Sequence, residues 1–222
     1  MNGDQVVAIG LKDVSKKFDD KIILDSISLN IHKGDFICLY GKSGCGKTTL
    51  LNIIGTLENY NDGSVEIFNK LDPIKHPKAS LKLRREKIAY LFQNFALVEK
   101  MTVEENLKLA LKYNKVKNKK ELIKEVLSEM GILDKLKAKV FKLSGGEQQR
   151  VALARNMLKP YEIMLADEPT GSLDEENKKV VIETLLNLNR QGKTIVIVTH
   201  DKDFLKVAKK VYLIENGKLI SK

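Results

Sequence analysis

The sequence of 222 residues predicts an α/β fold with a mainly parallel core sheet. Short apolar runs suited to buried strands alternate with longer segments that have the apolar spacing of helices. One apolar run is joined to a helical segment by a glycine-rich loop, which is the context of a phosphate-binding loop. Hydrophobic residues make up 43% of the chain, enough for one large α/β domain or two small ones.

The formal net charge of +10 is an excess that can indicate a nucleic acid or an anionic membrane surface as partner. The lysines are scattered over predicted helix faces, however, and the densest group, in residues 112–120, favours a solvated surface, with affinity for anionic lipid as the alternative. No apolar stretch approaches the roughly 18 residues of a membrane span, and the first residues are unlike a signal peptide. We therefore expect a cytoplasmic protein that binds no nucleic acid and reaches a membrane only through a partner.

Residues 5–40 alternate between apolar and polar side chains, which predicts a small antiparallel sheet with turns at 19–21 and 33–35. Phe18 lies in the first of these connections. It is a candidate to stack on a purine base, with packing at the rim of the sheet as the alternative.

The apolar run Phe36–Tyr40 leads into a glycine-rich loop that matches Gly, four residues, Gly-Lys-Thr, and a helix follows. The glycines allow successive backbone N–H groups to point at one phosphate, next to the positive end of the helix dipole. Lys47 would reach the terminal phosphates, and the Thr48 hydroxyl would bind Mg²⁺. The predicted nucleotide-binding residues here are Gly41, Lys42, Ser43, Gly44, Cys45, Gly46, Lys47, Thr48 and Thr49.

After this helix we predict a turn at 61–64, a strand at 65–68, a basic helix at 80–87 and a strand at 87–92. Gln93 ends the last strand. The carboxyl ends of strands in an α/β sheet border the ligand crevice, which makes Gln93 a site candidate. A loop glutamine that faces water is the alternative.

Residues 94–142 are helical in pattern and form an inserted lobe that is expected to move on the α/β body. Thr102 and Glu105 form a capping box at the start of one helix, and a second helix runs from about Lys120 to Met130.

A second glycine-containing helix start follows, in which Ser144 is the predicted N-cap and Glu147 completes a capping box. Gly145 and Gly146 are poor helix formers, so their presence suggests that something approaches the backbone closely. An anion is the natural candidate at a helix amino terminus.

The strand Ile163–Ala166 ends in Asp167 and Glu168, two carboxylates that would be costly to bury without a cation or a proton-transfer role. Asp167 is the candidate Mg²⁺ ligand and Glu168 the candidate general base for an attacking water, with helix capping or solvation as the alternative. A long helix closes at Gly192, another buried strand ends at His200, and an Asn-Gly hairpin completes the pattern.

Together these motifs resemble the nucleotide-binding subunits of ABC transporters, over nearly the whole chain and in the family's order. The family's elements correspond to the phosphate loop Gly41–Thr48, the glutamine loop at Gln93, the signature at 143–148, the second nucleotide motif at 163–168, the D-loop Ser172-Leu173-Asp174 and the switch histidine His200. The resemblance implies a P-loop NTPase of the ABC-ATPase fold. Its nucleotide-binding core, with an antiparallel β subdomain, would comprise residues 1–92 and 160–222, and its helical subdomain residues 93–159.

The resemblance also implies ATP hydrolysis with Mg²⁺ in a head-to-tail dimer that sandwiches ATP between the phosphate loop of one copy and the signature of the other. Ser144, Gly145 and Gly146 would then contact ATP across the interface, and Asp174 would couple the two sites. In the same chain, Gln93 and His200 would contact the attacking water and the γ-phosphate, and Gln93 is also a candidate Mg²⁺ ligand. Phe18 becomes the adenine-stacking aromatic, although the family more often has Tyr there.

Within the family, residues 91–106 and 165–174 resemble the branch that serves macrolide and peptide exporters and lipoprotein release. This implies a separate transmembrane permease and a position on the inner face of the cell membrane. Phe95, Leu97 and Met101 are predicted to form the groove for the permease, with ordinary lobe core as the alternative. An ABC-type ATPase that acts on nucleic acid or ribosomes is the competing hypothesis, although this chain has neither a long coiled-coil insertion nor a second cassette.

Overall fold

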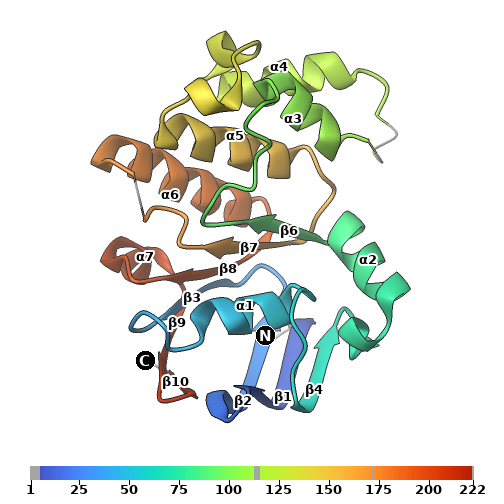
Figure 1. Cartoon of the computed structure of the whole chain (residues 1–222), viewed down its shortest axis with the longest axis vertical. Coiled ribbons are helices and arrows are strands. Elements are labelled where there is room, and N and C mark those ends of the chain that lie inside the picture. The colour runs from blue at the N-terminus through green and yellow to red at the C-terminus, as the bar shows by residue number, and fades with distance from the viewer. Residues whose placement is uncertain (1–5, 113–115, 172, 222) are drawn as a thin grey trace, which may run out of the picture.

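The computed structural model describes residues 6–112, 116–171 and 173–221 (Figure 1). Part of the lysine-rich segment predicted at 112–120, and Ser172 of the predicted D-loop, lie outside these residues. From one end to the other, Figure 1 shows an antiparallel sheet, a core sheet flanked by helices, and a group of helices. Within the described ranges, every helix is too short or too polar to cross a membrane.

The antiparallel sheet has the order β2-β1-β4-β5 and confirms the predicted antiparallel pairing for residues 7–32, whereas residues 36–40 belong to the core sheet. A tight turn joins β1 (Val7–Phe18) to β2 (Lys21–His32). On the other side of β1 lie β4 (Asp62–Ile67) and the short β5 (Lys70–Leu71).

The turn predicted at 61–64 is wrong, because β4 already begins at Asp62. Gly63 has a positive φ of 91°, and a Cβ atom there would lie 2.5 Å from the carbonyl oxygens of Lys12 and Asp13. The glycine therefore serves a close approach between two paired strands at an irregular register, which sequence alone does not distinguish from a turn.

The core sheet has the order β10-β9-β3-β8-β7-β6, and all of its pairs are parallel except β9 with β10. Its strands are β3 (Phe36–Tyr40), β6 (Ile88–Leu91), β7 (Ile163–Asp167), β8 (Thr194–Thr199), β9 (Lys210–Glu215) and β10 (Lys218–Ser221). Every residue of β6, β7 and β8 is buried, as expected for parallel strands covered on both faces. Positive φ angles at Asn216 and Gly217 confirm the Asn-Gly hairpin.

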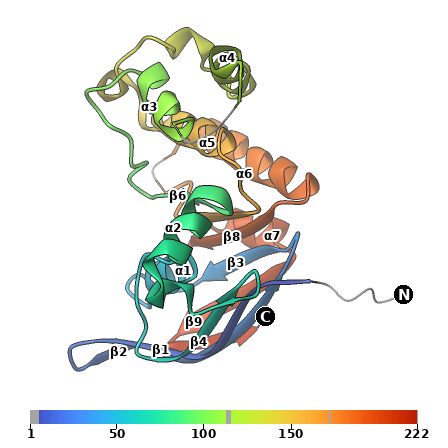
Figure 2. The same cartoon turned by 90° about the vertical axis from the view of Figure 1, so that its right-hand side faces the viewer.

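Side chains of the core strands alternate between two hydrophobic clusters, one on each face of the sheet. Helix α1 (Lys47–Ile54) and the antiparallel sheet cover one face. On the other face lie α5 (Gly145–Met157) and α6 (Glu175–Arg190) (Figure 2). The structure also contains α2 (Pro77–Glu86) and a short helix that the sequence analysis did not predict, α7 (Lys202–Val207).

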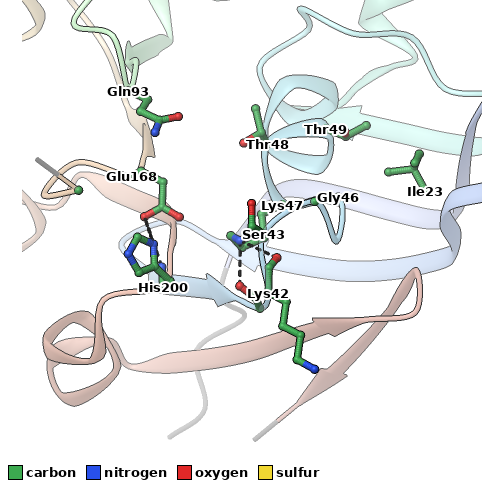
Figure 3. A pocket seen from close by; sticks show the side chains of 13 residues that line it. Ile23, Lys42, Ser43, Gly46, Lys47, Thr48, Thr49, Gln93, Glu168 and His200 are labelled. Carbon is green, nitrogen blue, oxygen red and sulfur yellow. Dashed lines mark hydrogen bonds and ion pairs between the residues drawn. The ribbon is translucent and has the colours of Figure 1, made fainter.

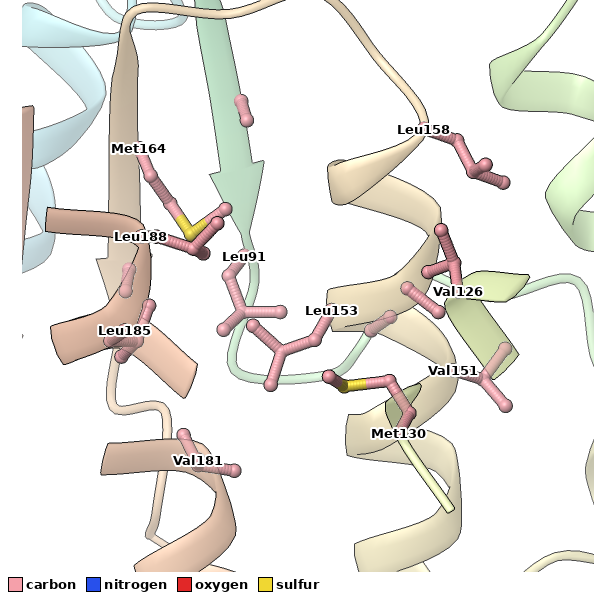
Figure 4. Packing of buried hydrophobic residues seen from close by; sticks show 14 of the residues in the cluster. Leu91, Val126, Met130, Val151, Leu153, Leu158, Met164, Val181, Leu185 and Leu188 are labelled. Carbon is pink, nitrogen blue, oxygen red and sulfur yellow. The ribbon is translucent and has the colours of Figure 1, made fainter. Parts of the chain in front are cut away.

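The helical lobe is built from α3 (Val103–Ala110) and α4 (Lys119–Glu129) on α5. Figure 4 shows Leu153 of α5 beside Leu91 of β6, and Val151 on the side of Val126 of α4. Both predicted capping boxes are present, at Thr102 with Glu105 and at Ser144 with Glu147. Short 3₁₀ helices at Pro73–Lys75, Leu133–Lys135 and Val140–Lys142 complete the described structure.

Candidate functional site

The carboxyl edge of the parallel sheet borders a cavity of about 600 Å³ (Figure 3). The glycine-rich loop between β3 and α1 forms one wall, and residues that follow β6, β7 and β8 form the other. The lining residues are Ile23, Gly41, Lys42, Ser43, Gly44, Gly46, Lys47, Thr48, Thr49, Gln93, Glu168, Gly171 and His200.

The loop approaches other backbone segments so closely that glycine is required at two positions. A Cβ atom on Gly41 would lie 2.5 Å from the carbonyl oxygen of Ile214. Gly46 is the N-cap of α1 with a φ of 101°, a left-handed conformation that side chains rarely adopt. The Lys47 ammonium donates hydrogen bonds to the carbonyl oxygens of Gly41 and Lys42, at 2.9 and 3.0 Å. These contacts keep the buried lysine folded along the loop that a phosphate group would occupy.

Thr48 and Asp167 bring two oxygen atoms together at the floor of the site. The Thr48 hydroxyl donates to Asp167 Oδ1 at 3.1 Å. Burial, reinforced by the nearby Glu168 charge, raises the pKa of the Asp167 carboxyl, and the Thr48 hydrogen bond and the Lys47 charge oppose this shift. A carboxylate in such surroundings gains from a cation, and Mg²⁺ binds one or two protein oxygens together with substrate phosphates. The residues therefore fit Mg²⁺, and Gln93, which lines the site cavity, also lines an adjoining cavity together with Asp167.

Glu168 holds its carboxylate at the end of β7 in an uncommon backbone conformation with a φ of 43°. Such left-handed conformations cost about 1–3 kcal/mol in a residue other than glycine. The Glu168 N–H donates to the Val198 carbonyl at 2.9 Å, which ties the residue to β8. Glu168 Oε2 lies 3.0 Å from His200 Nδ1, a contact that forms an ion pair when the imidazole is protonated (Figure 3).

The structure therefore brings the predicted catalytic residues Lys47, Gln93, Glu168 and His200 to one cavity. Sequence reasoning missed two neighbours, Ile23 and Thr199. Ile23 lines the cavity from β2, and the Thr199 hydroxyl donates to Glu168 Oε2 at 3.0 Å. The available signal for Thr199 was its position next to His200 at a strand end.

Two predicted nucleotide contacts lie outside this cavity in the described structure. Phe18 is 46% exposed at the end of β1, with the Lys16 ammonium 4.4 Å from its ring centre. Cys45 lines a separate cavity of about 500 Å³ behind the loop, and its Sγ packs close to Gly41. The adenine contact of Phe18 and the nucleotide contact of Cys45 both stay predictions.

The second predicted anion site, at the start of α5, does not line this cavity either. Ser144 Oγ accepts from the Glu147 N–H, and Glu147 accepts from the Ser144 N–H in return. In the described part of the chain, no hydrogen bond uses the N–H groups of Gly145 and Gly146. The helix start therefore has two free donors of the kind that bind anions.

Asp174 caps α6 close to this helix start. Its carboxylate accepts from the Asn177 N–H at 2.8 Å, which holds the pKa of Asp174 below its usual range. The Asn177 side chain also touches Gly146, where a Cβ atom would lie 2.4 Å from it. Asp174 thus neighbours the start of α5.

Comparisons with known proteins agree with this geometry. The ABC transporter family model matches residues 24–171. The chain is 41% identical over 216 residues to the macrolide export ATP-binding/permease protein MacB of Campylobacter jejuni, and the match covers 96% of this chain. It is 37% identical to the ABC transporter ATP-binding protein YvrO of Bacillus subtilis, with 95% of this chain and 94% of YvrO covered. The chain spans only about a third (34%) of the length of the MacB relative.

Solved structures give the same result. The dimeric ATP-binding cassette MJ0796, in a post-hydrolysis state bound to ADP and Pi, matches with a TM-score of 0.89 and 34% identity. That match covers 96% of this chain and 97% of the MJ0796 chain.

Proposed function

This chain belongs to the ABC transporter family, and from that membership we propose that it drives a separate membrane permease by cycles of ATP binding and hydrolysis. The chain is an ABC ATPase domain with the fold of the MJ0796 cassette. The proposal covers the role of each site residue, the assembly of two copies and the membrane partner. The observation that carries the proposal is the meeting of Lys47, Thr48, Glu168 and His200 at one cavity.

In the proposed mechanism, the glycine-rich loop binds the phosphates of ATP through its backbone N–H groups. Lys47 exchanges its contacts with the loop carbonyls for contacts with the terminal phosphates. Thr48, Asp167 and Gln93 would hold Mg²⁺, which supplies neutralising charge to the phosphate oxygens when bound.

Glu168 acts as the general base. It accepts a proton from the attacking water, while His200 holds one oxygen of the same carboxylate. In this mechanism Glu168 also positions the water in line with the γ-phosphate. The proposed catalysis therefore combines positioning of the water with electrostatic stabilisation of the phosphate charge.

The start of α5 supplies the second half of the site, in trans. Ser144, Gly145 and Gly146 do not line the cavity of their own chain, and the two glycines have free N–H donors. A head-to-tail dimer would bring these donors to the γ-phosphate bound by the other copy, with Asp174 near the junction. The dimeric MJ0796 structures support this assembly.

The permease is proposed to dock where the helical lobe meets the core. A cavity of about 340 Å³ there is lined by apolar side chains, including Leu57, Tyr90 and Phe92, and by Arg155 and Lys159. None of the residues predicted for the groove, Phe95, Leu97 and Met101, lines this cavity. Phe95 and Leu97 are half-buried against the core cluster, and Met101 is also half-buried. The similarity to MacB favours export or extraction of a substrate, with this chain on the inner face of the membrane.

A groove variant tests the permease assignment. Leu57 is 43% exposed within the groove, and Leu81 is 41% exposed outside it, on α2. We expect Leu57→Glu to abolish co-purification with a polytopic membrane protein from the native membrane, whereas Leu81→Glu should retain it. Retained co-purification by Leu57→Glu would contradict the groove, and nucleic-acid binding with a steep salt dependence would support the competing hypothesis.

Phosphate release measured against protein concentration tests the mechanism. Turnover per molecule should rise with concentration, because each site needs two copies, and Glu168→Gln should reduce it to a small residual rate at every concentration. A rate per molecule that stays constant down to the lowest measurable concentration would contradict the dimeric site. Unchanged turnover in Glu168→Gln would contradict the general base.

A further inference from the structure

We propose that Thr199 is a positioning residue that fixes which oxygen of Glu168 receives the proton from water. The inference rests on the proposed role of Glu168 as general base and adds a residue to that mechanism. Thr199 is the last residue of β8 and is completely buried.

The Thr199 hydroxyl is fixed in direction by its own surroundings. The Asp201 N–H donates to Thr199 Oγ1 at 3.0 Å, and Thr199 Oγ1 lies 3.0 Å from Glu168 Oε2. A backbone N–H can only donate, so it uses an acceptor position of the hydroxyl oxygen. The hydroxyl proton is then left for the Glu168 carboxylate, and the burial of Thr199 excludes water as a competing partner.

The two oxygens of the Glu168 carboxylate have different surroundings as a result. Oε2 accepts from the Thr199 hydroxyl at 3.0 Å and from the backbone N–H of His200 at 3.3 Å, and His200 Nδ1 lies 3.0 Å from it. Among the described residues, no side chain or backbone group donates to Oε1. Oε2 is thus the anchored oxygen, and Oε1 is the one available to accept a proton from the attacking water.

His200 and Thr199 contribute to this anchoring in different ways. The His200 side chain is 71% exposed, so water competes for its ring. The Thr199 hydroxyl comes from a buried strand in the middle of the sheet, between β3 and β7. We infer that Thr199 supplies the fixed contact and that loss of its hydroxyl lets the carboxylate rotate out of line with the water.

A matched control lies at the other end of the same strand. Thr194 is also buried, and its Oγ1 accepts a hydrogen bond from the Gly34 N–H at 3.0 Å, away from the cavity. Thr199→Val and Thr194→Val each replace one buried hydroxyl in β8 by a methyl group of similar size. Only the first removes a donor to Glu168.

The experiment compares ATP turnover and nucleotide binding in the purified full chain. Thr199→Val should lower kcat about 10- to 100-fold, the usual range for loss of a hydrogen bond that orients a reactive group, with the KM for ATP within about twofold of the original. Thr199→Ser should restore most of kcat, because serine returns the hydroxyl. Thr194→Val should retain kcat even if its melting temperature falls.

A double variant separates positioning from general structural damage. If Thr199 acts only through the Glu168 carboxylate, adding Thr199→Val to Glu168→Gln should lower the residual rate by less than about twofold. A fall equal to that of the single variant would overturn the proposal, and so would an unchanged kcat in Thr199→Val while Glu168→Gln loses most of its activity. Full activity of Glu168→Gln would instead contradict the general base itself, so the two failures are distinguishable.

Discussion

The protein has two helix starts with free backbone donors, and they differ in how completely each is surrounded. The loop before α1 lies among the ends of β6, β7 and β8, with the buried Lys47 beside it. The start of α5 has its capping box, with Ser144 and Gly145 exposed. The first element can bind a nucleotide within one chain, whereas the second has donors without a binding cavity around them. This difference is the physical basis for our proposal that a second copy completes the site.

The largest expected effect comes from removing the positive charge of Lys47 beside the loop before α1. Lys47→Ala should weaken ATP binding about 100-fold, because charge-assisted hydrogen bonds to phosphate are each worth about 1.5–3 kcal/mol. Titration with a fluorescent ATP analogue measures this loss. Lys82→Ala, which removes a lysine that is 63% exposed on α2, is the matched control and should bind as before. Equal affinities in all three proteins would contradict the role of Lys47.

The next effect should separate ATP binding from ATP hydrolysis, through a substitution at the start of α5. Ser144→Ala should leave ATP binding to the single chain unchanged but lower turnover about 10-fold. This is less than the roughly 100- to 1000-fold cost of losing a transition-state donor, because the Gly145 and Gly146 N–H donors remain. It also removes a helix cap, at a cost of about 1 kcal/mol. Thr102→Ala removes the equivalent cap of α3 and controls for this cost.

Calorimetry should find similar destabilisation of both cap variants, with turnover lowered in Ser144→Ala alone. Equal turnover in the two would mean that Ser144 is only a helix cap. If Ser144→Ala weakens ATP binding in dilute protein, Ser144 must contribute to the nucleotide site of its own chain rather than to that of a second copy.

The comparison also indicates what could be predicted from the sequence. The phosphate loop and the residues at strand ends were predictable because one short motif specifies the loop, and parallel strands bring their carboxyl ends to one edge. The start of β4 was not, because Gly63 reads as a turn until its approach to β1 is known. Three features depend on tertiary packing, which a local sequence pattern does not contain. They are the placement of Cys45 in a second cavity, the contact of Ile23 with the site cavity and the hydrogen bond from Thr199 to Glu168.

A stability measurement should show that the buried Asp167 carboxylate of the nucleotide cavity destabilises the folded protein. The pKa of Asp167 is raised in the folded protein, chiefly by burial, so its ionisation opposes folding above its ordinary pKa of 3.8. Asp167→Asn should therefore raise stability at pH 7, by about 1 kcal/mol or about 2–4 °C in Tm, and the gain should vanish as the pH falls below 3.8. Thermal unfolding across this range tests it. A loss of stability at pH 7 would show that the Thr48 hydrogen bond outweighs the cost of burial.

The smallest effect should have the opposite sign and lie in the helical lobe. Glu104 of α3 pairs with Lys108 at 2.7 Å and with Lys137, and these hydrogen bonds lower the pKa of its carboxyl from 4.5 to about 2. A lowered carboxyl pKa stabilises the fold above about pH 4.5, and this stabilisation is lost as the pH falls through about 2. Glu104→Gln should therefore destabilise the protein at pH 7 by up to about 1 kcal/mol, the upper range for ion pairs with exposed lysines, and match the original only well below pH 2, where the folded carboxyl is also protonated. Since Lys137 is 76% exposed, its pair should contribute least, and Lys137→Met should reproduce only part of the loss. Acidification would then relieve the site carboxylate and weaken the lobe. A Glu104→Gln deficit that persists well below pH 2 would attribute its effect to packing instead of charge.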